Sequence, residues 1–68
     1  MWLNGSKIML NGNQVAEVIY SNGSFVIRNK RPNGTIGVCF TSTDGRDPIT
    51  DFLTKTYPGY TVMKFKPN

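Results

Sequence analysis

Short runs of alternating apolar and polar residues fill the first part of the chain, and Asn-Gly pairs separate them. The pairs at 11–12, 22–23 and 33–34 follow one another at a spacing of eleven residues, and another stands at 4–5. Asn-Gly favours the two-residue type I′ turn, because both central residues of that turn need a positive φ. The runs 7–10, 14–20, 24–30 and 35–41 are rich in β-branched and aromatic residues. The pattern therefore predicts a four-stranded antiparallel meander.

Two-residue turns also fix which residues stand opposite one another. The turn at 11–12 would pair Ile8 with Val15, and the turn at 33–34 would pair Asn29 with Val38. One face of the sheet is then apolar enough for a core, and it collects Met9, Ala16, Val18, Tyr20, Phe25, Ile27, Ile36, Val38 and Phe40. The outer face is mixed, and it collects Ile8, Leu10, Val15, Glu17, Ile19, Val26, Arg28, Lys30, Cys39 and Thr41.

A helix and a last strand complete the predicted fold. Asp47 suits the N-cap and Pro48 the first helical position, and a buried stripe follows at i, i+3, i+4 spacing until Pro58-Gly59 ends the helix near 57. Residues 60–66 read as a fifth strand, expected antiparallel to the first. We therefore predict a single α+β domain over 1–68, in the order ββββαβ. Its predicted core is Phe25, Ile27, Val38, Phe40, Phe52 and Leu53.

Composition argues against catalysis. The chain has 68 residues, one cysteine and no histidine, so it lacks the Ser-His and Cys-His pairs that activate nucleophiles and the ligand sets typical of zinc. Asp44, Asp47 and Asp51 are better explained as turn and helix-start residues than as a metal site. We expect a non-enzymatic protein without cofactor or metal. A lone Cys39 and the absence of a long apolar run favour the cytoplasm and no membrane contact.

Basic residues suggest a ligand of opposite charge. Eight Lys and Arg against four acids give a net charge of +4, which favours anionic partners such as nucleic acid. The residues expected to contact nucleic acid across the outer face of the sheet are Arg28, Lys30, Arg31, Lys64 and Lys66. The competing explanation is that this face is simply solvated and that Arg28 pairs with Glu17 across the strands.

The aliphatic residues of the outer face support a second hypothesis. A protein-binding module, possible also as a homodimer, would use an apolar patch made of Trp2, Ile8, Val15, Ile19 and Val26. Cover from Trp2-Leu3 and the chain ends is the alternative explanation for the same residues.

Two resemblances bear on these hypotheses. A short antiparallel sheet backed by one helix resembles the sheet-reading DNA-binding domains of one type of plant factor and of the arm-binding regions of some integrases. A helix, then Tyr57-Pro58-Gly59-Tyr60, then a strand ending in basic residues resembles many small phage-encoded proteins. Some of those bind and inhibit host enzymes, so the resemblance implies an inhibitor or accessory factor of a phage or mobile element. Neither resemblance assigns a site residue.

Overall fold

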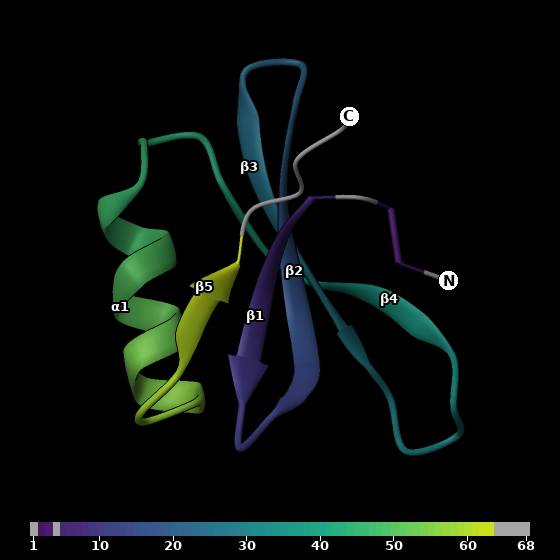
Figure 1. The fold of residues 1–68 in the computed structure, drawn as a ribbon. Helices are drawn as coiled ribbons and strands as arrows, with labels where there is room; N and C mark the ends of the chain where they lie inside the picture. The colour runs from purple at the N-terminus through teal and green to yellow at the C-terminus, as the bar shows by residue number, and fades with distance from the viewer. Residues whose placement is uncertain (1, 4, 64–68) are drawn as a thin grey trace, which may run out of the picture.

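The computed structural model describes residues 2–3 and 5–63, and its elements follow the predicted order ββββαβ. The strands are β1 (Ser6–Leu10), β2 (Asn13–Ser21), β3 (Ser24–Lys30), β4 (Ile36–Ser42) and β5 (Thr61–Met63), and the helix is α1 (Asp47–Thr56). They form one antiparallel sheet in the order β4-β3-β2-β1-β5, so the last strand pairs with the first as expected (Figure 1). Of the fifth strand expected over 60–66, residues 64–66 lie outside the described residues.

Two of the Asn-Gly pairs form the predicted turns. Asn11 and Asn22 have φ of 53° and 52°, and the φ of the glycine after each is also positive. The β2–β3 pairing is confirmed throughout, with Val18 opposite Ile27 and Glu17 opposite Arg28. Because β1 begins at Ser6, opposite Val18, this hairpin extends beyond the start of β1, as the upper loop in Figure 1 shows.

Because of a bulge in β2, the pairing of β1 differs from the prediction. Met9 stands opposite Gln14 as expected, but the register then shifts, so that Ile8 faces Ala16 and Val15 is the extra residue. A bulge of this kind turns the following side chains to the other side of the sheet. Ile8 therefore lies in the core with 1% of its surface exposed, whereas we expected it on the outer face; Met9, expected in the core, belongs to the outer face.

The link between β3 and β4 departs from the prediction twice. The pair at 33–34 does not form a two-residue turn: Lys30 pairs with Ile36 across a longer loop, closed by a 2.7 Å hydrogen bond from Arg31 N to Thr35 O. A bulge between Val38 and Phe40 then restores Ile27 opposite Phe40. Val38 consequently pairs with Arg28 on the outer face, where it is 53% exposed, and Ile36 lies beside Lys30. Both were expected in the core.

The helix covers the opposite face of the sheet. Its buried stripe is Ile49 and Leu53, and Phe52 stacks on Phe40 with ring centres 4.8 Å apart. The N-cap prediction is wrong by one residue: Arg46 takes that position without a side-chain hydrogen bond, and Asp47 is the first helical residue. Its carboxylate still suits the positive end of the helix dipole.

The core is small and lies between α1 and the middle of the sheet. Five apolar residues are buried in it: Ile8, Ala16, Ile27, Ile49 and Leu53. Phe25, Phe40 and Phe52 pack against them while remaining partly exposed, so of the six residues predicted to form the core only Val38 is misplaced. Tyr20 lies on the helix-facing side, yet it is 66% exposed because it sits near the end of the projecting hairpin.

Candidate binding surfaces

The centre of the outer face is occupied by a buried ion pair. Glu17 on β2 is fully buried, and its Oε1 accepts a 2.6 Å bond from Nη1 of Arg28 on β3. A buried carboxylate needs several donors as well as a counter-charge. Arg28 therefore makes the cross-strand pair with Glu17 that was the competing explanation for this residue.

Two backbone N–H groups near the N-terminus also donate to Glu17. The backbone N–H of Leu3 lies 2.9 Å from each carboxylate oxygen, and that of Gly5 lies 3.4 Å from Oε2. We call Trp2, Leu3 and Gly5 the N-terminal strap. Cover from Trp2-Leu3 was one expected explanation for the aliphatic outer face; the strap lies against Val18 and Ile19 at Gly5, while the Leu3 side chain remains 54% exposed.

The strap approaches β2 so closely that position 5 requires glycine. A Cβ on Gly5 would stand 2.5 Å from the backbone oxygen of Val18 and 2.5 Å from Cγ2 of Ile19. A Cβ added to Gly37 would meet the guanidinium of Arg31. That group is the end of a flexible, exposed side chain that can move.

Gly5→Ala is therefore expected to destabilise the protein by about 1–3 kcal/mol, as overpacking against backbone does. Gly37→Ala is the matched control, expected to cost less than about 0.5 kcal/mol. Urea unfolding of both variants measures the difference. Equal stability of the two variants would show that the strap does not press on β2.

Two further predicted contacts lie among the described residues. Lys30 and Arg31 are both exposed at the end of β3 and in the loop that follows. Lys64 and Lys66, the remaining predicted nucleic-acid contacts, lie outside the described residues. The structure thus pairs Arg28 with Glu17 and places the Arg31 guanidinium over Gly37, opposite Asn29.

The predicted protein interface is also smaller than expected. Ile8 is in the core, and Val15 packs against the core from its place in the bulge. Trp2, Ile19 and Val26 are partly buried. A second copy of the chain would meet fewer apolar side chains on this face than the sequence suggested.

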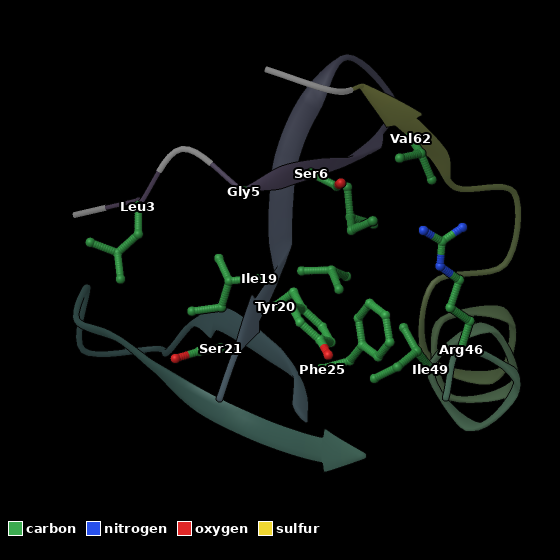
Figure 2. A pocket seen from close by; sticks show the side chains of 12 residues that line it. Leu3, Gly5, Ser6, Ile19, Tyr20, Ser21, Phe25, Arg46, Ile49 and Val62 are labelled. Atoms are coloured by element: carbon green, nitrogen blue, oxygen red, sulfur yellow. The ribbon is translucent and has the colours of Figure 1, made fainter. Parts of the chain in front are cut away.

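A hollow that the sequence did not reveal lies beside the strap and includes Ile8 and Ile19 of the predicted interface. An open hollow of about 840 Å³ is bounded by the strap, the start of β1, the β2–β3 hairpin, the start of α1 and β5. Most of its lining is apolar, and the lining side chains are Leu3, Ser6, Ile8, Val18, Ile19, Tyr20, Ser21, Phe25, Arg46, Ile49 and Val62. Figure 2 shows Tyr20, Phe25 and Ile49 gathered together, with Arg46 reaching toward Val62.

The aromatic residues of the hollow hold one another in place. The rings of Tyr20 and Phe25 meet edge to face with centres 4.8 Å apart, and the Arg46 guanidinium lies 5.8 Å from the centre of the Phe25 ring. Cation–π contact of this kind positions the guanidinium over the ring. No motif marks this site, because its lining comes from segments far apart in the chain.

Cys39 shows no activation. It is exposed at the bulge in β4, and desolvation by the surrounding chain raises the pKa of its thiol. The thiol therefore stays protonated at neutral pH, whereas a reactive cysteine needs a lowered pKa. Within residues 2–3 and 5–63, no three His, Cys, Asp or Glu side chains are grouped so as to hold a metal ion.

Comparisons with known proteins do not assign these surfaces. No protein-family model matches the chain, and neither the curated proteins nor the solved structures contain a match. In the part of the chain that the structure describes, no helix is long and apolar enough to cross a membrane.

Proposed function

We propose that this protein is a non-enzymatic binding module and that a protein partner occupies the apolar hollow. The observation that carries the proposal is the exposure of large apolar side chains around this one hollow. Leu3 is 54%, Tyr20 66% and Val62 51% exposed, and all three belong to the lining. Contiguous apolar surface exposed to water is costly and commonly marks an interface.

The shape of the hollow favours a macromolecular partner over a small molecule. Sites for small molecules are concave enough to bury about 70–90% of the ligand. This hollow is open and lies between separate elements, so it suits a side chain that projects from a larger surface. An aromatic or aliphatic anchor seated in such a recess is typical of the centre of a protein interface.

The chemistry of the lining is also that of a binding surface. Ser6 and Ser21 contribute hydroxyls, but no His, Cys, Asp, Glu or Lys is among the described residues that line the hollow. A serine without a neighbouring base is a poor nucleophile. This composition supports binding rather than catalysis.

The test is selection of a displayed random peptide library on the immobilised protein, followed by affinity measurements on two variants. Val62→Glu places a carboxylate in the hollow and is expected to weaken the selected peptides at least about tenfold, because the peptide must then desolvate that charge. Val38→Glu is the matched control: it makes the same change at a similarly exposed site on the outer face. Binding that both variants retain would defeat the proposal.

A second candidate function is nucleic-acid binding by the basic end of the β3–β4 hairpin. It is favoured by the exposure of Lys30 and Arg31, which are consecutive in the chain, and by the net charge of +4. Residues of this kind contact phosphate without reading sequence.

If the hairpin binds nucleic acid, affinity for a single-stranded oligonucleotide should fall about tenfold between roughly 50 and 200 mM salt, as release of two to three counterions requires. The Lys30→Glu, Arg31→Glu double variant should abolish binding, whereas Lys55→Glu on α1 should reduce it little. Fluorescence anisotropy measures all three. Absence of binding at the lower salt concentration would remove this candidate.

A further inference from the structure

The charge at the edge of the hollow indicates what kind of partner fits it. Arg46 is the one charged residue among the described residues that line the hollow. Glu17 neutralises Arg28, but no salt bridge to Arg46 occurs within residues 2–3 and 5–63. Its guanidinium is held over Phe25 and points into the hollow (Figure 2).

The charged groups nearest Arg46 in the chain differ in whether they line the hollow. Arg46 stands at the N-cap of α1, whose first backbone N–H groups carry partial positive charge. The neighbouring carboxylates of Asp44 and Asp47 are exposed and are not part of the lining. A ligand in the hollow therefore meets an apolar floor and a cationic edge.

We infer that the occupant is an acidic segment of a protein partner, in which an Asp or Glu stands near a bulky apolar residue. The apolar side chain enters between Tyr20, Phe25 and Val62. The carboxylate binds the Arg46 guanidinium, which offers a planar pair of donors suited to it. This inference rests on the proposed function and deepens it, since the proposal requires only an apolar ligand.

The inference is tested on the peptides selected from the displayed library, with charge reversal on the protein. The selected sequences should be enriched in Asp and Glu beside Phe, Leu or Trp. Arg46→Glu should weaken a selected peptide at least about tenfold, whereas Lys55→Glu, the same charge change at the far end of α1, should alter its affinity less than about twofold. A peptide whose acids are replaced by Lys should bind Arg46→Glu more tightly than it binds the parent protein.

Binding of the Lys-substituted peptide to Arg46→Glu also shows that this variant is folded, because a misfolded protein would bind neither peptide. Circular dichroism of that variant provides a second check. Selected peptides that depend on Val62 but carry no acid, or that ignore Arg46, would overturn the inference and leave the proposed function standing. Failure to select any peptide that depends on Val62 would overturn both. An oligothymidylate that binds the parent protein but not Arg46→Glu would identify the hollow as a nucleic-acid site instead.

Discussion

Glu17→Ala is expected to destabilise the protein by about 3–5 kcal/mol, the usual result of removing one partner of a buried ion pair. The substitution leaves the Arg28 guanidinium without its carboxylate, and it removes the acceptor for the backbone N–H groups of Leu3 and Gly5. A domain of this size has a small free energy of unfolding. Thermal unfolding followed by circular dichroism should therefore show a large fall in Tm or an unfolded protein.

Asp51→Ala is the control for this prediction, since it removes an exposed acid from α1. Its expected effect is within about 0.5 kcal/mol. The double variant Glu17→Met, Arg28→Leu separates charge from packing: replacing both partners with apolar residues should recover much of the lost stability. Hydrogen exchange at Leu3 should still be fast in the double variant, because the strap has lost its acceptor. A Tm for Glu17→Ala close to that of Asp51→Ala would contradict the buried pair.

Ile27→Ala is expected to cost about 2–5 kcal/mol, and Val38→Ala almost nothing. Both residues were expected in the core from the sequence, but Ile27 is fully buried, whereas Val38 is 53% exposed. The two residues lie on adjacent strands and carry similar side chains, so the comparison isolates burial. Urea denaturation with a common m-value measures both changes. Similar destabilisation by the two substitutions would mean that Val38 faces the core and that the bulge at Cys39 is wrong.

The sequence predicted the fold well because its signals were local. Turns at 11–12 and 22–23 depend on backbone preferences of two adjacent residues, and the helix depends on a short periodic stripe. Bulges have no comparable local signal. Val15 and Cys39 resemble ordinary strand residues, and only the packing of whole strands against α1 decides that one of them is extra. The errors at Ile8 and Val38 follow directly from these two residues.

The binding surfaces were harder to predict for a different reason. Pairing of Glu17 with Arg28 was open to prediction, since cross-strand neighbours follow from the turn. The hollow was not, because Val62, Arg46 and Tyr20 are distant in sequence and meet only when β5 returns beside β1. Residues of this kind look unremarkable in a pattern of apolar and polar positions until their exposure is known.

The loop of residues 31–35 and the bulge in β4 compensate for each other. The loop shifts the pairing of β4 by one residue relative to a two-residue turn, and the bulge shifts it back before Phe40 reaches Ile27. The pairing set by the loop and the bulge together therefore decides which face of the sheet the β4 side chains occupy. A change in the loop that moved the pairing of β4 by one residue would need an accompanying change at Cys39; otherwise the segment from Phe40 to Ser42 would present its side chains to the opposite face and Phe40 would lose its contact with Phe52.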